Sequence, residues 1–230
     1  MIPIINKPIL EYNIEKMRNI GIDTIFVVVG HKKEVIQEYF GDGKEFGVKI
    51  KYVINKDPKG TGIADSIYLT KRYIDEPFIV VLGDDFTVIN SFECFVKKFF
   101  KEKALVVEGI VYEEDMNNLM RTNCISLGEN NRILKIIEKP NKPKFRLRGI
   151  GIYIFDIVVF DFIKKMPKCL YGPGRDITVT IQLMAQEGGA YGVFIDGINF
   201  NINTLGDLTK AMNYVLRFKL KNKKDNKNNI

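Results

Sequence analysis

The sequence predicts an α/β fold with a mostly parallel central sheet, helices on both faces and antiparallel additions in its second half. With 230 residues, the chain can form one large α/β domain. Its first half alternates short apolar runs with segments whose apolar residues recur at helical spacing, which is the pattern of βαβ units. The apolar run 78–82 has no polar alternation, as expected for a strand buried on both faces of a parallel sheet.

The elements of the first half follow from local signals. Pro8 opens the first helix, Leu10, Ile14 and Met17 share one of its faces, and Gly21 ends it. Strands are then expected at residues 24–29, 48–54, 78–82 and 104–111, and further helices at residues 32–40, 64–73 and 92–100. Each strand followed by a helix favours right-handed parallel connections.

The second half has a different character. Residues 123–127 and 133–137 flank a Gly-Glu-Asn-Asn turn and are expected to form a hairpin. The remaining expected elements are strands at 149–155 and 190–195 and helices near 156–166, 178–187 and 206–218. Residues 1–218 are therefore expected to form one domain, followed by a basic, disordered tail at 219–230.

Charge and apolar content limit the partners. The net charge is +7, and much of it lies in the tail, where no aromatic residues are interleaved to stack on bases. A solvated tail is therefore expected rather than specific nucleic-acid binding. No apolar run approaches the roughly 20 residues of a membrane span, so no membrane association is expected. The N-terminus lacks the pattern of a signal peptide and the three cysteines are scattered, which favours a cytoplasmic protein.

The residues after the run 78–82 are the first candidate for chemistry. Gly83, Asp84 and Asp85 follow the point where the strand should end, and open α/β sheets bind ligands at the carboxyl ends of their strands. Two carboxylates there could hold Mg2+. The competing interpretation is a simple turn, because Gly and Asp are common turn residues.

Seven short motifs then occur in one order along the chain. They are NKPILEY at 6–12, GDG at 41–43, PKGTGIA at 58–64, LGDD at 82–85, EKP at 138–140, GIYIF at 151–155, and NINT at 201–204 with Asp207-Leu208. This ordered set resembles the sugar-1-phosphate nucleotidyltransferases, especially the glucose-1-phosphate thymidylyltransferases and uridylyltransferases. The resemblance runs from Met1 to about Phe218.

The resemblance implies a GT-A-like, Rossmann-type domain that joins a nucleoside triphosphate, of the dTTP or UTP class, to a sugar-1-phosphate such as glucose-1-phosphate. The products would be a nucleotide-sugar and pyrophosphate, and the cofactor would be Mg2+. Such a reaction needs no covalent protein intermediate. It requires cations on the phosphates and two substrates held in line.

The same resemblance assigns roles to the most reactive residues. Asp84 matches the metal-binding Asp after the central strand, and we take it as catalytic together with Lys139. Glu138 is expected to accept sugar hydroxyls, while Lys139 is expected to meet the sugar phosphate, whose charge requires a cation. Without the resemblance, Glu138 and Lys139 would be interpreted as a solvated pair.

Further substrate contacts are implied at backbone and amide positions. Gly60 and Gly62 lie in the loop expected to approach the base, although a glycine-rich lead into a helix is an equal alternative. Asn55 stands where the family typically has a base-reading Gln, and it is one methylene shorter. Gly83 and Gly151 are also expected at the substrate site.

The chain departs from the family pattern in several places. The family opens with a buried strand and a Gly-x-Gly-x-Arg phosphate loop before its Met-Ile-Pro-Ile segment, which is here residues 1–4. The first strand and loop are therefore expected to be lacking. Asn201 occupies the position of a second metal-binding Asp, and its amide brings no charge to Mg2+. Asn123 falls near a family Gly whose backbone meets the sugar.

These departures leave several hypotheses open. The chain could be a truncated product or one with a misassigned start, or a degenerate relative that binds sugar nucleotides without making them. A degenerate relative of this kind could pair with an active paralogue. Homo-oligomer formation is a further hypothesis. A GT-A glycosyltransferase is a further alternative, against which the Glu138-Lys139 motif speaks. We expect the chain alone to be weakly active or inactive.

Overall fold

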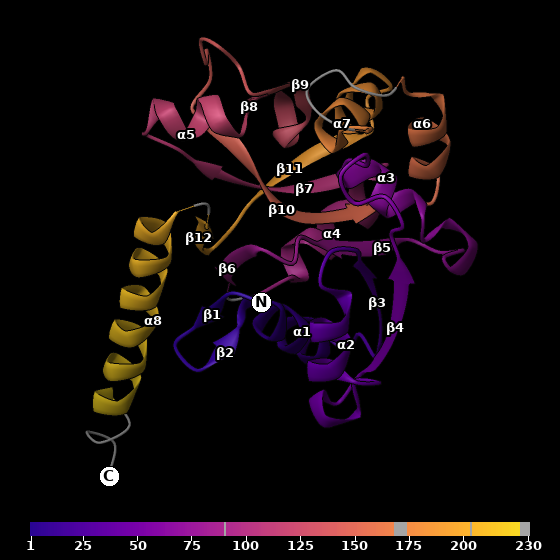
Figure 1. Ribbon diagram of the computed structural model, residues 1–230. Coiled ribbons are helices and arrows are strands. Elements are labelled where there is room, and N and C mark those ends of the chain that lie inside the picture. The colour runs from indigo at the N-terminus through magenta and orange to yellow at the C-terminus, as the bar shows by residue number, and fades with distance from the viewer. Residues whose placement is uncertain (90, 168–173, 203, 226–230) are drawn as a thin grey trace.

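A computed structural model describes residues 1–89, 91–167, 174–202 and 204–225 (Figure 1). Its largest core cluster packs strands against α6 (Val159–Lys165) and α7 (Ile177–Gln186) on one side of the central sheet. A second cluster packs α4 (Glu93–Glu102) against the other side. The expectation of helices on both faces of a sheet is met by this arrangement.

The central sheet is mixed, and the prediction of a mostly parallel sheet is wrong. Its strand order is β11-β7-β10-β8-β9, and β5 also pairs with β10. Among its described strands, only β7 and β11 run parallel, whereas β10 runs antiparallel to β5, β7 and β8. Its strands are β5 (Phe78–Val81), β7 (Val106–Tyr112), β8 (Asn123–Leu127), β9 (Ile133–Glu138), β10 (Leu147–Phe155) and β11 (Ala190–Phe194).

Three smaller strand pairs complete the fold. The strands β3 (Thr24–Val29) and β4 (Lys49–Ile54) form a parallel pair. This pair packs against α1 (Ile9–Asn19) and α2 (Lys33–Phe40). The antiparallel pair β6 (Asp85–Ile89) and β12 (Gly197–Asn201) follows the turn after β5. The shortest pair is β1 (Pro3–Ile4) with β2 (Lys7–Pro8).

The remaining helices are short, apart from the last. They are α3 (Ile63–Tyr68), α5 (Met116–Arg121) and α8 (Leu205–Asp225), with 3-10 turns η1 (Lys44–Phe46), η2 (Lys71–Tyr73) and η3 (Glu129–Asn131). Helix α8 continues beyond Phe218, where we expected the domain to end, and residues 226–230 lie outside the described residues. None of the described helices is long and apolar enough to cross a membrane.

Strand β5 is less buried than its sequence predicts. All four of its residues are only partly buried, although the run was expected to be covered on both faces. One edge of β5 pairs with β10, and a large cavity lies along the strand and is also lined by β3. Solvent reaches the apolar side chains through this cavity.

Candidate active site

Asp84 and Asp85, adjacent in sequence, have different environments. Asp84 lies in the turn after β5 and is exposed, whereas Asp85 begins β6 and is buried. The Asp85 carboxylate accepts a hydrogen bond from the Gly151 backbone N–H at 2.7 Å and another from the Asn199 side-chain amide. These two hydrogen bonds of Asp85 hold the turn against β10 and β12, while the Asp84 side chain faces solvent.

Electrostatics agree with a structural role for Asp85. Burial raises the pKa of the Asp85 carboxyl, although its two hydrogen bonds oppose that effect. On α1, burial lowers the pKa of Lys16 to about 8, while the charge of Asp85 acts in the opposite direction. Lys16 donates to the Thr87 carbonyl at 2.5 Å, so this partly buried lysine holds α1 against β6.

Asn201 lies at the same end of the β6–β12 pair as the acidic turn. It is the register partner of Asp85 and therefore lies one residue from the partner position of Asp84. Asn199 contacts Asp85 and the Thr87 hydroxyl. Within the described residues, no group of three His, Cys, Asp or Glu side chains could together hold a metal ion.

A second centre lies where β9 ends. Glu138 is the register partner of Asn123 on β8, and its carboxylate accepts from the Thr178 hydroxyl at 2.9 Å. Burial, followed by the charge of Asp176, raises the pKa of Glu138 to about 7. Glu138 is therefore a hydrogen-bond acceptor that titrates near neutral pH.

Lys139 adopts a backbone conformation that is rare for a residue with a side chain. Its φ is +42°, and its backbone N–H donates to the Thr122 carbonyl at 2.6 Å. The ammonium is 3.8 Å from the Glu138 carboxylate, and about half of the side chain is exposed. Because the backbone is held at this turn, the lysine head extends into solvent beside Glu138.

Asn123 falls near a family Gly whose backbone meets the sugar, and here its side chain forms a hydrogen bond within the protein. Its side-chain oxygen accepts from the Gly149 backbone N–H at 2.7 Å, which ties β8 to β10. Beside it lies Glu108 on β7, which is fully buried. A Cβ added to Gly149 would lie 1.8 Å from the Glu108 carboxyl oxygen, so only glycine fits there.

Glu108 is the functional candidate that sequence reasoning missed. Neither of its carboxyl oxygens has a hydrogen-bond partner within the described residues. Burial, with the charge of Glu138 as a second cause, raises the pKa of Glu108 well above its ordinary value. The only sequence signal was a single acid inside the apolar run 104–111.

In the loop after β4, the polar groups form hydrogen bonds with one another. The Asn55 amide donates to the Thr61 hydroxyl at 2.6 Å and accepts from the Asp57 backbone N–H at 3.0 Å. A Cβ on Gly60 would collide with Asp57, and one on Gly62 would lie 2.1 Å from the Arg175 carbonyl oxygen. Gly62 is thus required by packing, whether or not a base approaches, whereas the clash at Gly60 is with the exposed Asp57 side chain, which can move aside.

The structure brings the candidates together in two groups. Asn55, Gly62, Gly83 and Asp84 line the cavity along β3 and β5, while Asn123, Glu138 and Lys139 lie where β8 and β9 meet. Strand β10 connects the groups, because Gly151 holds Asp85 and Gly149 holds Asn123.

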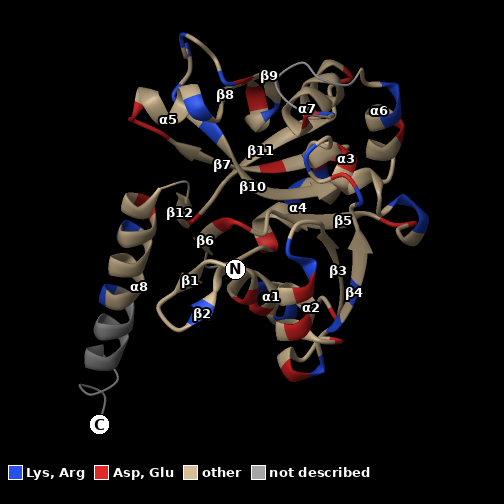
Figure 2. Cartoon of the chain, viewed as in Figure 1, with Lys and Arg blue, Asp and Glu red and all other residues tan. Residues whose placement is uncertain are grey.

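Acidic residues near both groups affect the pKa of one tyrosine of β10. Burial raises the pKa of the Tyr153 hydroxyl well above its ordinary value, and four acidic neighbours add to this effect, namely Glu108, Asp85, Glu138 and Asp176. The two groups therefore border one acidic region around β10. Figure 2 shows acidic segments both at the turn after β5 and at the end of β9.

The model of the family described as "Nucleotidyl transferase" matches residues 1–215 of this chain. The chain belongs to the nucleotidyl transferase family. Among curated relatives, it is 32% identical over 216 residues to the bifunctional protein GlmU of Methanocaldococcus jannaschii, covering 94% of this chain and 48% of GlmU. It is 30% identical to the UTP–glucose-1-phosphate uridylyltransferase of Synechocystis, covering 96% of this chain and 59% of that enzyme. The chain thus spans about half the length of these relatives.

Solved structures show the same fold. A UDP-glucose pyrophosphorylase complexed with UDP-glucose superposes with a TM-score of 0.82, covering 94% of this chain and 89% of that protein. Its sequence identity is 21%, so this likeness concerns the fold. The resemblance to sugar-1-phosphate nucleotidyltransferases predicted from the motifs is confirmed.

Proposed function

We propose that this chain transfers a nucleotidyl group from a nucleoside triphosphate of the dTTP or UTP class to a sugar-1-phosphate such as glucose-1-phosphate. The observation that carries this proposal is the pairing of Glu138 and Lys139 at the end of β9, in a chain of this family. One residue offers a hydrogen-bond acceptor and the other an exposed cation. A sugar phosphate requires both.

The reaction is a single displacement at phosphorus. A phosphate oxygen of the sugar-1-phosphate attacks the α-phosphorus, the bond to the β-phosphate oxygen breaks, and pyrophosphate leaves with the electron pair. Lys139 would pair with the sugar phosphate and Glu138 would accept sugar hydroxyls. Asn55, Gly60, Gly62, Gly83, Asn123 and Gly151 would position the two substrates through backbone and amide contacts.

The residues present fit Mg2+, which the family typically uses. This ion is commonly bound by one or two carboxylates together with substrate phosphates and water. Asp84 would supply an exposed carboxylate and Asn201, from the same end of β12, an amide oxygen. When bound, Mg2+ would neutralise charge on the triphosphate.

A nucleotide and sugar panel tests the proposal. The chain would be incubated with Mg2+, each nucleoside triphosphate and each sugar-1-phosphate, and pyrophosphate release measured. We expect Lys139→Ala and Asp84→Asn each to lower kcat/KM by roughly 10- to 100-fold, as for a lost charged contact. Lys142→Ala, which removes a neighbouring exposed lysine, is the matched control and is expected to leave kcat/KM unchanged.

A second candidate function is sugar-nucleotide binding without turnover. Such a chain would associate with an active paralogue or form a homo-oligomer, and it would act in the cytoplasm. It is favoured by Asn201, because only one carboxylate of the acidic turn is exposed and its partner strand offers an amide. Calorimetric binding of a nucleotide-sugar with no pyrophosphate release would support this candidate. Sugar transfer to an acceptor would instead indicate a glycosyltransferase.

A further inference from the structure

Arg148 on β10 is a buried charge between two acceptors that come from different parts of the fold. Only 7% of its surface is exposed. Its Nε donates to the carboxylate of Glu113, just after β7, at 3.1 Å, and a terminal nitrogen donates to the side-chain oxygen of Asn199 on β12 at 2.9 Å. A guanidinium is a rigid planar fork of donors, so it fixes the positions of both acceptors relative to each other.

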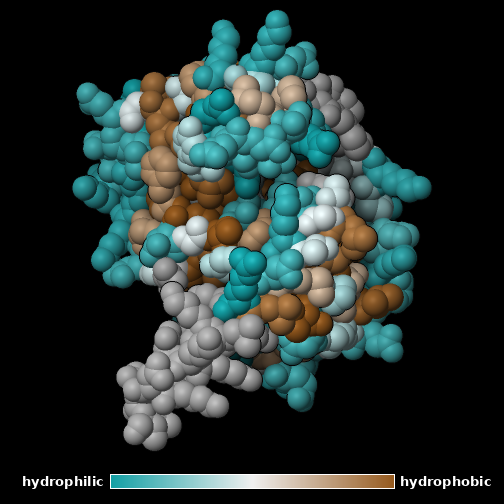
Figure 3. Space-filling view, turned by 90° about the vertical axis from the view of Figure 1, so that its left-hand side faces the viewer, coloured by the Kyte–Doolittle hydropathy of each residue, from teal (hydrophilic) through white to brown (hydrophobic). Residues whose placement is uncertain are grey.

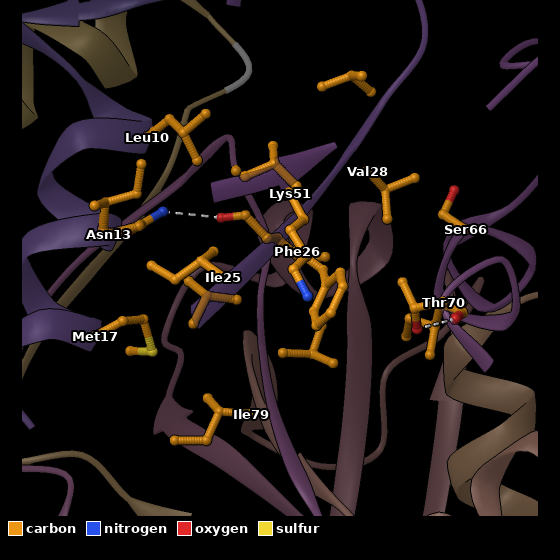
Figure 4. A pocket seen from close by; sticks show the side chains of 18 of the residues that line it. Leu10, Asn13, Met17, Ile25, Phe26, Val28, Lys51, Ser66, Thr70 and Ile79 are labelled. Atoms are coloured by element: carbon orange, nitrogen blue, oxygen red, sulfur yellow. Dashed lines mark hydrogen bonds between the residues drawn. The ribbon is translucent and has the colours of Figure 1, made fainter. Parts of the chain in front are cut away.

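The Asn199 side of Arg148 leads to the acidic turn after β5. The Asn199 amide donates to the carboxylate of Asp85, the residue that directly follows Asp84. Helix α1 holds the same turn from a second direction. Its Asn13, seen at the cavity wall in Figure 4, donates to the backbone carbonyls of Leu82 and Asp85 at 3.1 and 3.3 Å. The position of the exposed Asp84 is therefore set by its buried neighbours.

The Glu113 side of Arg148 leads to the turn that holds Lys139. The Glu113 carboxylate also accepts from the side-chain amide of Asn118 on α5 at 3.3 Å. The Asn118 carbonyl accepts from the backbone N–H and the hydroxyl of Thr122, at 3.0 and 2.7 Å. The Thr122 carbonyl in turn accepts from the Lys139 backbone N–H at 2.6 Å. A continuous series of hydrogen bonds thus runs from Lys139 through Arg148 to the acidic turn.

We propose that Arg148 is a positioning residue that sets the orientation of Asp84 relative to Lys139. This inference rests on the proposed function, in which the Asp84 end of the site takes the triphosphate and Lys139 takes the sugar phosphate. Attack in line at phosphorus requires the two substrates to be held in a fixed relative orientation. Glu113, Arg148 and Asn199 all lie outside the seven motifs of the sequence, so the motif resemblance does not assign this role.

Burial makes the connection through Arg148 stiff. A buried guanidinium that loses an acceptor keeps an uncompensated desolvation cost, so displacement of either acceptor is resisted. Lysine carries the same charge on one ammonium group and cannot hold two acceptors with the geometry of the fork. Methionine would fill part of the space and donate to neither acceptor.

The first test measures backbone amide exchange by NMR in the free protein and needs no substrate. Its reporters are the Gly151 N–H, which donates to Asp85, and the Lys139 N–H at the other end of the series. We expect Arg148→Met to speed exchange of both amides about fivefold, because both ends lose their shared support. Arg148→Lys should give a smaller increase at both, and it replaces the methionine variant in every arm if that variant does not fold.

A double-mutant cycle separates transmission through Arg148 from general loosening. Glu113 does not bond Asp85, so its influence on the Gly151 amide must pass through Arg148. Glu113→Gln should speed Gly151 exchange about threefold in the wild type and have no further effect in Arg148→Met. Equal effects in the two backgrounds, or no effect in either, would overturn the proposal.

The matched control is Arg146→Met. It removes a guanidinium two residues away that donates to the Glu114 carbonyl at 2.6 Å and lies outside the series. Exchange at Gly151 and Lys139 should stay at the wild-type rate in this variant. Faster exchange at both amides would show that any lost arginine loosens this region, and would count against a specific role for Arg148.

Steady-state kinetics provide the second test. We expect Arg148→Met to lower kcat by roughly 10- to 100-fold and to change KM for either substrate by less than about threefold, because the binding groups remain and only their alignment is lost. Arg148→Lys should recover part of kcat, and Arg146→Met should match the wild type. An unchanged kcat would overturn the proposal. If the wild type turns over no substrate pair, the proposed function fails, and the exchange cycle alone decides whether Arg148 links the two ends.

Discussion

Burial leaves the Glu138 carboxyl partly protonated near neutral pH, because its pKa is raised to about 7. In the unfolded chain the ordinary pKa is 4.5, so the folded state binds more protons between about pH 4.5 and 7. The contribution of Glu138 to the free energy of unfolding therefore falls as pH rises through this window. We expect the wild type to lose on the order of 2 kcal/mol more than Glu138→Gln between pH 5 and 8, after allowance for solvent screening.

Urea unfolding of both proteins at pH 5 and pH 8 measures this difference. Thr178→Val, which removes the hydroxyl that donates to Glu138, is a useful companion because that hydrogen bond lowers the Glu138 pKa. The pH dependence should then grow. Parallel pH profiles for the wild type and Glu138→Gln would contradict the prediction.

Glu108 tests whether an unpartnered buried carboxyl costs stability. Both of its oxygens are buried without a partner within the described residues. Replacing such a group by an apolar side chain of similar shape removes a desolvation cost. We expect Glu108→Met to raise the free energy of unfolding by about 1–3 kcal/mol in urea titrations, whereas Glu108→Gln should gain little. A less stable Glu108→Met protein would show that the carboxyl has a favourable contact.

Single-residue environments could be predicted only in part. The sequence located Asp84, Glu138 and Lys139 through their motifs, and the structure places Glu138 and Lys139 at one strand end. It could not separate Asp84 from Asp85, because which acid is buried depends on hydrogen bonds to Gly151 and Asn199, far along the chain. The isolation of Glu108 depends on the same long-range packing.

At the scale of elements, α3 and the segment before α7 are joined by an ion pair. The Arg175 guanidinium is 2.8 Å from the Asp65 carboxylate, which also accepts from the backbone N–H groups of Arg175 and Gly62. Burial raises the pKa of Asp65, but these hydrogen bonds and the Arg175 charge outweigh it and lower the pKa. The contact holds α3 to the α7 side of the sheet.

We therefore expect Asp65→Asn to cost about 2 kcal/mol in free energy of unfolding, as for a partly buried charged hydrogen bond. Asp161→Asn is the control, because its pair with Lys71 is exposed and 3.4 Å long and should be worth less than about 1 kcal/mol. Urea titration of the two variants gives the comparison. Equal losses would mean that burial adds nothing to the Asp65 contact.

Local patterns predicted most elements but not their pairing. Thr24–Val29 forms a strand with the expected bounds because its apolar run and its flanking signals are local. The β6–β12 pair was missed because Asp85, Thr87 and Asn199 interrupt its apolar pattern, and α5 was missed as well. The antiparallel position of β10 between β5 and β7 depends on partners 35 to 77 residues earlier, from Leu147↔Tyr112 to Phe155↔Phe78, which no local pattern encodes.

At the scale of the molecule, the β3–β4 pair shares no strand pairing with the central sheet within the described residues, and side-chain packing attaches it. It contacts the remainder through α1, whose Asn13 and Lys16 bond the β5–β6 region, and directly through Phe26, whose ring stacks on Tyr73 with centroids 5.4 Å apart. Figure 3 shows polar and hydrophobic surface interspersed on one face of the molecule. Regions with few shared backbone hydrogen bonds open at lower free energy than the global transition.

We expect amides of β3 and β4 to exchange with solvent at least tenfold faster than those of β7 and β10 in the free protein. Native-state hydrogen exchange read by mass spectrometry measures this, with α4 and α7 as internal references for the central core. Uniform protection across both sheets would contradict the prediction and indicate a single cooperative unit.

Strand β10 also has a consequence for how the chain is made. It pairs with β5, β7 and β8, all of which are synthesised before it, and its last residue is Phe155. Until that residue has left the ribosome, β5, β7 and β8 each lack β10 as a pairing partner. Because this pairing is long-range, it makes folding slow. A nascent chain stalled before β10 would then be a preferred client for chaperones, and one stalled after it would be far less so.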